Sequence, residues 1–294
     1  MSTLSQTPTP TQTVGFIGQG FIGGSMADDV EERGFSVVRF AREEPHVGNR
    51  AQIADCDVVF VAVPTPTTPE GFDPSVLRSV LPLVGQGKIA VIKSTVLPGT
   101  TRRLQAEFPE ITLMHAPEFL REKYAAEDTR HPARTILGLP EDTPRYREAA
   151  KQVLAILPDA PYQLVCSSEE AELIKYGGNC FLATKLIFMN TLFDAATAVG
   201  ANYDVVAEAM AADPRIGGSH MRVVDSSGHP GAVPGRGAGG HCFPKDLAAF
   251  REFFEHAAED EAGLALLRAL ETKNNALLRA SRKDLDLLEG IYGE

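Results

Sequence analysis

The sequence lacks the features of membrane, secreted and nucleic-acid-binding proteins. No apolar run approaches the roughly 20 residues that span a bilayer, and the N-terminus has no apolar signal-peptide core. Lysine and arginine total 28 against 39 acidic residues, and the net charge of -11 argues against nucleic acid or an anionic membrane as a partner. We therefore expect a cytoplasmic protein that binds neither.

Cysteine is also scarce. Cys56, Cys166, Cys180 and Cys242 form no CxxC pair and no Cys/His spacing typical of metal ligands, so we predict no metal site and read all four as reduced thiols. The chain has 294 residues, 44% hydrophobic and 23% charged, which is typical of a globular protein with room for two modest domains.

The N-terminal part carries a dinucleotide-binding pattern. After a polar leader over residues 1–13, which we expect to be disordered, residues 14–17 predict a buried strand. A G-x-G-x-x-G sequence follows and opens a helical pattern. Such glycines permit a tight turn, close approach of a pyrophosphate and tight helix packing, while the helix N-terminus supplies N–H donors. The predicted cofactor contacts here are Gly18, Gly20, Phe21, Ile22 and Gly23.

The second strand, residues 36–40, should end in an acid that binds the adenosine ribose. Ala41 stands there instead, followed by Arg42. A missing carboxylate and a nearby guanidinium favour a 2′-phosphate. Alternatively, Arg42 is a solvated charge and Glu43 or Glu44 binds the ribose. These residues leave NAD and NADP both open.

Two further buried strands, residues 54–63 and 88–92, end in turns rich in proline, serine and threonine. Such turns lie at the carboxyl edge of a parallel sheet, where α/β folds bind ligands. Farther along, Glu118 and Glu122 would share a face if their turn is helical, and like charges there would raise a carboxylate pKa. The alternative is a solvated acidic face.

The second half of the chain is predicted to be helical. A helical pattern covers residues 168–200, with Ser168 able to cap its start and Gly200 able to end it. Lys175 and Asn179 are four residues apart, so they lie on one face. Another helical stretch covers residues 263–288.

The most informative segment is the glycine-rich run that ends in Cys242 and a helix start. A thiol just outside a helix N-terminus lies in the positive end of the helix dipole, and Lys245 adds charge, so both favour the nucleophilic thiolate. Asp246, about one turn on, can reach back toward the sulfur. A buried structural cysteine is the alternative.

These segments, in this order, resemble the UDP-glucose/GDP-mannose dehydrogenase family. The motifs are Val63-Pro64-Thr65-Pro66, Ser94 through Thr100, Pro117 through Glu122, Ala171 through Lys185, Arg215-Ile216-Gly217 and Gly239 through Asp246. The resemblance implies an α/β fold with an N-terminal Rossmann doubly wound parallel sheet (14–165), followed by an all-helical domain with a long central helix (166–294). It also implies a homodimer built along that helix.

The family oxidises a primary alcohol twice, through an aldehyde, to a carboxylate, and mostly uses NAD. The resemblance therefore implies NAD as cofactor, with NADP possible. It assigns catalytic roles to Cys242, Lys175, Asn179, Asp246, Glu118 and Thr95. It assigns cofactor contacts to Arg42, Val63, Pro64, Thr65, Ser94, Thr95, Glu122 and Lys245. It assigns substrate contacts to Glu118, Phe119, Leu120, Arg121, Lys175, Asn179, Arg215, Gly239 and Cys242.

The sequence departs from the family pattern at four points. The ribose-binding acid is absent, residues 40–51 form an unusually short segment, and His241 replaces a small residue before the cysteine. The sequence also ends where family members begin a third domain that helps hold the nucleotide sugar, so the substrate stays open. A single-step alcohol dehydrogenase and a non-catalytic nucleotide-binding relative are the alternatives.

Overall fold

The computed structural model describes residues 12–229 and 231–293 and divides into two compact units. The first unit runs to Thr65 and resumes over Pro74–Lys175, and the second comprises Pro66–Asp73 and the chain from Tyr176 onward. The predicted leader lies outside the described residues up to residue 11, whereas Thr13 already belongs to the first strand.

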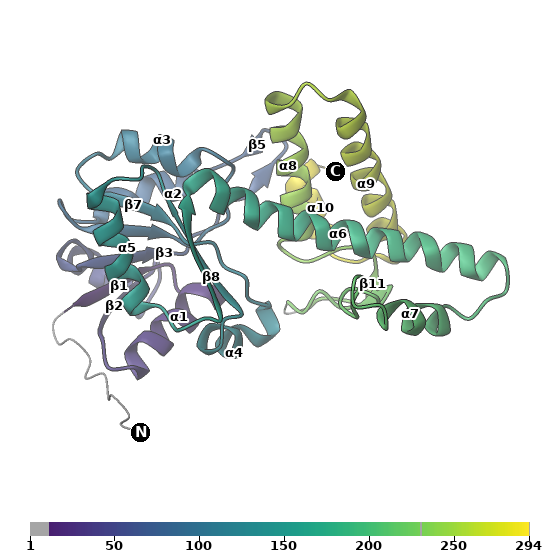
Figure 1. Cartoon of the computed structure of the whole chain (residues 1–294), viewed down its shortest axis with the longest axis horizontal. Helices are drawn as coiled ribbons and strands as arrows, with labels where there is room; N and C mark the ends of the chain where they lie inside the picture. Colours follow the sequence, from purple (N-terminus) through teal and green to yellow (C-terminus); the bar gives the residue numbers. More distant parts are fainter. Residues whose placement is uncertain (1–11, 230, 294) are drawn as a thin grey trace. The chain divides into compact units, whose positions relative to one another are not determined.

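A seven-stranded sheet forms the centre of the first unit, in the order β2-β1-β3-β6-β7-β8-β9 (Figure 1). The pairs from β2 to β7 are parallel, β8 runs antiparallel to β7, and β9 is parallel to β8. β3 and β6 are wholly apolar and wholly buried, as expected for strands covered on both faces. The strands are β1 (Thr13–Ile17), β2 (Ser36–Phe40), β3 (Val58–Val61), β6 (Ile89–Ile92), β7 (Thr112–His115), β8 (Arg134–Leu139) and β9 (Tyr162–Ser167).

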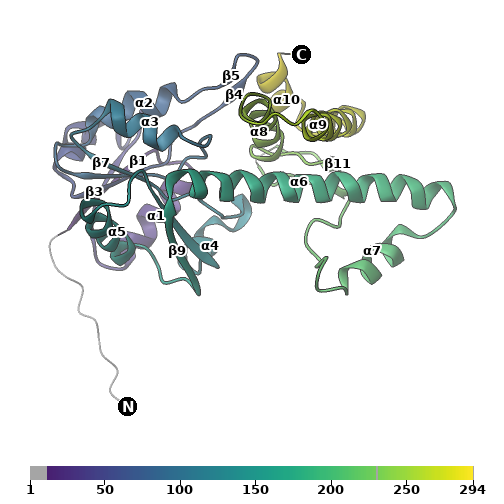
Figure 2. The same cartoon turned by 45° about the horizontal axis from the view of Figure 1, so that its top comes forward.

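Helices cover both faces of this sheet. α1 and α5 pack on one face through a core that includes Met26, Val30 and Val153 together with the stacked rings of Phe16 and Phe60, 5.3 Å apart. Figure 2 shows α2 and α3 on the opposite face. The helical segments are α1 (Phe21–Glu32), η1 (Val47–Asp55), α2 (Ser75–Val80), η2 (Leu81–Leu83), α3 (Thr100–Glu107), η3 (Glu122–Tyr124), α4 (Ala125–Arg130) and α5 (Pro144–Ile156), where η marks a 3-10 helix. The predicted doubly wound fold is confirmed.

The second unit is mainly helical. It contains α7 (Tyr203–Ala211), α8 (Phe243–Ala257), α9 (Glu261–Ser281) and α10 (Leu285–Tyr292). Two short antiparallel pairs accompany them: β4 (Thr67–Thr68) with β5 (Gly71–Phe72), and β10 (Val224–Asp225) with β11 (Gly235–Arg236). The long helix α6 (Ser168–Ala198) belongs to the first unit up to Lys175 and to the second unit beyond it.

The long helix is confirmed, but its start differs from the prediction. Ser167, not Ser168, makes the cap: its hydroxyl accepts from the Glu170 N–H at 3.3 Å, and the Glu170 carboxylate accepts from the Ser167 N–H at 2.8 Å. This reciprocal pair is a capping box. At the other end Gly200 takes a φ of +71°, which suits a helix terminus.

The predicted helix over 263–288 is two helices. Arg282 and Asp284 adopt positive φ between α9 and α10, so the apolar periodicity continues across a break in the backbone.

Candidate active site

The glycines of the turn between β1 and α1 differ in what an added side chain would meet. A Cβ on Gly18 would lie 2.2 Å from the carbonyl oxygen of Ala62, and one on Gly23 would lie 2.0 Å from that of Gly18. A Cβ on Gly20, in contrast, would meet nothing within 4 Å. The open side of the turn, at the N-terminus of α1, therefore has the space and the N–H donors that a pyrophosphate needs. These residues fit a dinucleotide.

The turns after β3 and β6 are joined by side-chain hydrogen bonds. The Ser94 hydroxyl donates to the Val63 carbonyl at 2.6 Å and accepts from the Val63 N–H at 3.0 Å. The Thr65 hydroxyl donates to the Thr95 carbonyl at 2.7 Å. The structure thus brings together two segments predicted to contact the cofactor, with Pro64 exposed beside them.

Two lysines flank Glu118 after β7. Lys93 Nζ lies 2.9 Å from Glu118 Oε2, and both side chains are largely buried. Lys175 Nζ donates to the Glu118 carbonyl at 2.5 Å. A small pocket opens beside this cluster, lined by Lys93, Glu118 and Arg134 among others. Lys93 was not predicted, although a lysine directly after an apolar buried strand was a usable signal.

Phe119 is held by the same cluster. Its N–H donates to Glu118 Oε1 at 2.8 Å, and its ring centroid lies 3.9 Å from the Arg134 guanidinium carbon and 5.5 Å from Lys175 Nζ. Such cation–π contacts hold the ring against Arg134 and Lys175. Leu120 is half-buried beside it.

His115 lies fully buried beneath these residues and is neutral. Its pKa is lowered to about 3, chiefly by burial and also by the charges of Lys93 and Lys175, although a hydrogen bond to Ser94 raises it. Its Nε2 lies 3.2 Å from the Ser94 carbonyl, so the ring donates to that carbonyl. His115 therefore fixes the turn after β6 rather than exchanging a proton.

Glu172 fixes the other end of that turn. From α6 its carboxylate accepts from the Gly99 N–H at 2.6 Å, the Thr101 N–H at 2.8 Å and the Thr101 hydroxyl at 2.6 Å. It thereby caps the first turn of α3. Burial raises the pKa of Glu172 to about 7 although these donors lower it. Glu172 lies within the motif from Ala171 through Lys185, but the sequence predicted no role for it.

The predicted pairing of Glu118 with Glu122 on a helical face is wrong. Residues 116–121 are not helical, and η3 begins only at Glu122. Bonds from Lys93 and the Phe119 N–H hold the Glu118 carboxylate against its own extended turn. Arg121 is bound by its guanidinium to Asp128 at 2.6 and 3.0 Å.

In the second unit, Cys242 occupies the N-cap position of α8, as predicted, and it is exposed. The carboxylate of Asp246, one turn on, is almost fully buried. It accepts from Asn179 Nδ2 at 2.6 Å and from Lys245 Nζ at 2.5 Å, and the Asp246 N–H donates to the Cys242 carbonyl at 2.8 Å. Four predicted residues are thus brought together.

The other three cysteines are held as neutral thiols. Burial raises the pKa of Cys56 and of Cys166 to about 11, and that of Cys180 to about 12, with nearby carboxylates adding to each. None of the four forms a disulfide.

Asp284, from the break between α9 and α10, holds the glycine loop before Cys242. Its carboxylate accepts from the Gly240 N–H at 2.7 Å, and a Cβ on Gly239 would lie 2.1 Å from Asp284 Oδ2. His229 Nε2 lies 3.0 Å from Asp284 Oδ1, and the His229 ring centroid lies 5.0 Å from that of His241. Sequence reasoning missed Asp284 because it lies 44 residues from Gly240.

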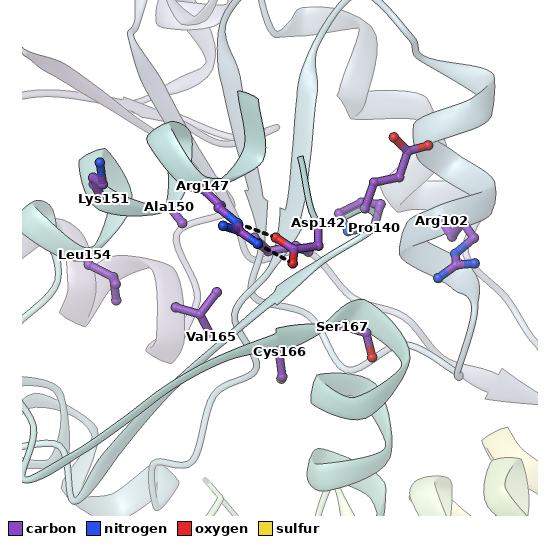
Figure 3. A pocket seen from close by; sticks show the side chains of 12 residues that line it. Arg102, Pro140, Asp142, Arg147, Ala150, Lys151, Leu154, Val165, Cys166 and Ser167 are labelled. Carbon is purple, nitrogen blue, oxygen red and sulfur yellow. Dashed lines mark hydrogen bonds and ion pairs between the residues drawn. The ribbon is translucent and has the colours of Figure 1, made fainter. Parts of the chain in front are cut away.

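Two further features are the Arg215 side chain and a pocket beside α5. Arg215 is exposed and pairs with Asp213 at 2.6 Å. A pocket of about 610 Å³ lies between the turn after β8, α5 and β9, where Figure 3 shows Arg147 bonded to Asp142. It is lined by none of the predicted site residues.

Comparison with known proteins connects these residues to a family. Residues 44–157 match the NAD binding domain of the UDP-glucose/GDP-mannose dehydrogenase family, and residues 169–276 match its central domain. The chain belongs to this family. The predicted resemblance and the NAD-binding domain are confirmed. The first match begins beyond the glycine turn and Arg42.

Relatives of this family show how far the likeness extends. A UDP-glucose 6-dehydrogenase of Pseudomonas aeruginosa is 34% identical over 238 residues, which are 76% of this chain and 49% of the relative. A UDP-glucose dehydrogenase structure from Pyrobaculum islandicum gives a TM-score of 0.77 at 28% identity, covering 96% of this chain and 72% of the other. This dehydrogenase-family chain spans about half the length of the curated relatives it matches.

The fold alone does not single out the family. A 3-hydroxyisobutyrate dehydrogenase structure from Mycobacterium tuberculosis gives a TM-score of 0.69 at 20% identity and covers 96% of this chain and 99% of the other. The chemistry must therefore be argued from the side chains. Among the described helices, none is long and apolar enough to cross a membrane.

Proposed function

We propose that this chain catalyses the NAD-dependent oxidation of a primary alcohol, on a nucleotide sugar or a nucleoside-like substrate, to a carboxylate in two steps. The observation that supports this proposal most strongly is the position of Cys242, which is exposed at the start of α8. Asp246 lies one helical turn away, and its carboxylate accepts hydrogen bonds from Asn179 and Lys245. A single-step alcohol oxidation does not need such a nucleophile. Membership of the family supports the same chemistry.

The bound cofactor would accept one hydride in each of the two oxidations. In the first, a base removes the alcohol proton. The final hydrolysis of the thioester needs a second base to activate water, and Thr95, Glu118 and Asp246 are the candidates for that role. The Cys242 thiolate then adds to the aldehyde carbon to give a thiohemiacetal, and loss of the second hydride leaves a thioester. Water attacks the thioester, and the thiolate leaves as the carboxylate forms.

The lysines and Asn179 supply positive charge and hydrogen-bond donors. Lys175 and Asn179, on one face of α6, are proposed to stabilise the oxyanion that develops at the reacting carbon. Lys93 orients the carboxylate of Glu118. Glu122 is proposed to contact the cofactor. The proposed substrate contacts are Phe119, Leu120, Arg121 and Gly239.

We also propose a cytoplasmic homodimer built along α6. Phe181 and Phe188 are 67% and 57% exposed and, with Gly177, Thr184 and Thr191, form an uncharged line at spacings of three and four residues. Such a line covers one face of a helix and favours a second copy as its occupant. Arg215 is proposed to reach the partner's site. The cysteines, which form no disulfide, support a reducing compartment.

The test is a screen of nucleotide sugars and free nucleosides that counts the reduced cofactor formed per substrate. Two per substrate, with acid as product, is the expected result. Cys242→Ser, which keeps the size but weakens the nucleophile, should stall the second half, whereas the control Cys166→Ser should not. One cofactor per substrate and little effect of Cys242→Ser would establish the single-step alternative. No turnover with intact cofactor binding would establish a non-catalytic relative.

A further inference from the structure

The end of β2 adjoins the turn where a pyrophosphate fits. The Gly18 N–H donates to the carbonyl of Phe40, the last residue of β2, at 2.9 Å. In Rossmann folds this strand end faces the adenosine ribose, whose hydroxyls usually bind an acidic side chain. Ala41 occupies that place and is half-buried, and Arg42 next to it is exposed. The strand end offers a small side chain and a positive charge instead of a carboxylate.

A second arginine reaches the same strand end from η1. Asn49 Nδ2 donates to the carbonyl of Arg39 in β2 at 2.9 Å, which ties the start of η1 to the strand. The guanidinium of the following Arg50 lies over the Phe40 ring, 6.0 Å from its centroid. Arg42 and Arg50 therefore flank one strand end from two separate segments.

Among the residues that the structure describes, neither guanidinium has an acidic partner. Arg39, in the same strand, pairs with Asp28 and Glu31 at 2.6 Å each. Over residues 12–229 and 231–293, neither Arg42 nor Arg50 forms an ion pair or a hydrogen bond to a carboxylate. Glu43 and Glu44 are exposed and bond to neither. In a chain of net charge -11, two such neighbouring cations indicate a place for an anion.

We propose that Arg42 and Arg50 form a subsite for the 2′-phosphate of NADP, so that the enzyme accepts NADP as well as NAD. A guanidinium binds a phosphate through parallel N–H donors, and Arg42 is free to do so. Ala41 leaves room for the phosphate and avoids the repulsion that a carboxylate would cause. The inference rests on the dinucleotide role proposed above.

Calorimetry with two isomeric ligands tests the subsite. 2′,5′-ADP and 3′,5′-ADP carry the same charge but differ in which ribose oxygen bears the second phosphate. The wild-type protein should bind 2′,5′-ADP about tenfold or more tightly than 3′,5′-ADP, since one charged hydrogen bond contributes that much. Equal affinity for the two isomers would overturn the proposal without any variant.

Substitutions then assign the preference to residues. Arg42→Ala and Arg50→Ala should each weaken 2′,5′-ADP and NADP about tenfold to a hundredfold and leave NAD nearly unchanged. Arg147→Ala is the matched control. Arg147 lies in α5, which connects β8 to β9 on the side of the sheet away from β2, and it pairs with Asp142 (Figure 3), so its loss should change the binding of neither cofactor. Equal losses for NAD and NADP in the Arg42 variant would show that Arg42 does not read the phosphate.

A reverse substitution separates this inference from the proposed function. Ala41→Asp should weaken the binding of NADP by tenfold or more and strengthen the binding of NAD. If the wild-type protein binds NAD but binds 2′,5′-ADP no more tightly than 3′,5′-ADP, the subsite is refuted and the dinucleotide role stands. If it binds neither NAD nor 2′,5′-ADP, the dinucleotide role itself is refuted.

Discussion

Selective alkylation of Cys242 tests whether the structure identifies the nucleophile correctly. At about pH 7.5 an ordinary exposed thiol with a pKa near 8.5 is about one-tenth thiolate. The pKa of Cys56 and of Cys166 is about 11, so about three in ten thousand of these groups are ionised at that pH. The difference in thiolate fraction alone therefore makes alkylation of an ordinary exposed thiol about three-hundredfold faster than alkylation of Cys56 or Cys166.

Intrinsic reactivity offsets part of this difference. A more basic thiolate attacks faster, with a Brønsted slope of about 0.45, so the reactivity of the buried thiolates is about thirteenfold higher and offsets that part of the difference. A net preference of about twentyfold remains before the helix N-terminus, Lys245 and the exposure of Cys242 are counted. Each of these should increase the preference.

The assay is a time course with limiting iodoacetamide, read by peptide mass spectrometry at each cysteine. Cys242 should be modified at least about twentyfold faster than the other three, and activity should fall in step with its modification. In denaturant the four rates should converge, which shows that the fold sets the difference. If Cys242 is the slowest in the native protein, or if fully alkylated protein still forms acid, the covalent mechanism is refuted.

Three further results are expected. Gly20→Val should fold normally but lose NAD binding, because its side chain meets only the space reserved for the pyrophosphate; Gly23→Ala should instead be destabilised in thermal unfolding by the clash of its Cβ with backbone. Glu172, whose pKa is about 7 in the folded protein and about 4.3 unfolded, keeps a proton in the folded state that the unfolded state has lost. Stability should therefore fall by about 2 kcal/mol from about pH 5 to 7 and level off above pH 7, a slope absent from Glu172→Gln. Phe181→Asp combined with Phe188→Asp should shift sedimentation from dimer to monomer; a wild-type chain that is monomeric and fully active at micromolar concentration would refute the dimer.

The first unit could be predicted largely from the sequence because its signals are local. Buried parallel strands are short apolar runs in the sequence. Positions 18 and 23 have no room for a side chain, so they must be glycine, and this produces the recognisable G-x-G-x-x-G pattern. The prediction of the last helix was wrong where the apolar periodicity of the sequence continued but the helical backbone conformation did not. Apolar spacing runs on through Arg282 and Asp284, yet both adopt positive φ and divide the predicted last helix.

The residues that hold the site in shape were harder to predict. Asp284 bonds to Gly240 from 44 positions away, and Glu172 bonds to Thr101 from 71 positions away. Their partners are backbone N–H groups, which every residue carries, so no residue type marks the contact in advance. Arg42 was noticed because it stands next to an expected acid, whereas Arg50 required the hydrogen bond from Asn49 that brings η1 to β2.

The first turns of α6 show why one family motif contains residues with different tasks. Glu172 and Lys175 are three positions apart and so share a face of the helix. Glu172 caps α3 at Gly99 and Thr101, while Lys175 donates to the carbonyl of Glu118. One helical turn therefore sets the spacing between the turn after β6 and the turn after β7, which carry predicted cofactor and substrate contacts. Loss of Glu172 would displace the first of these turns and leave Lys175 in place, so it should raise KM for NAD more than it lowers kcat.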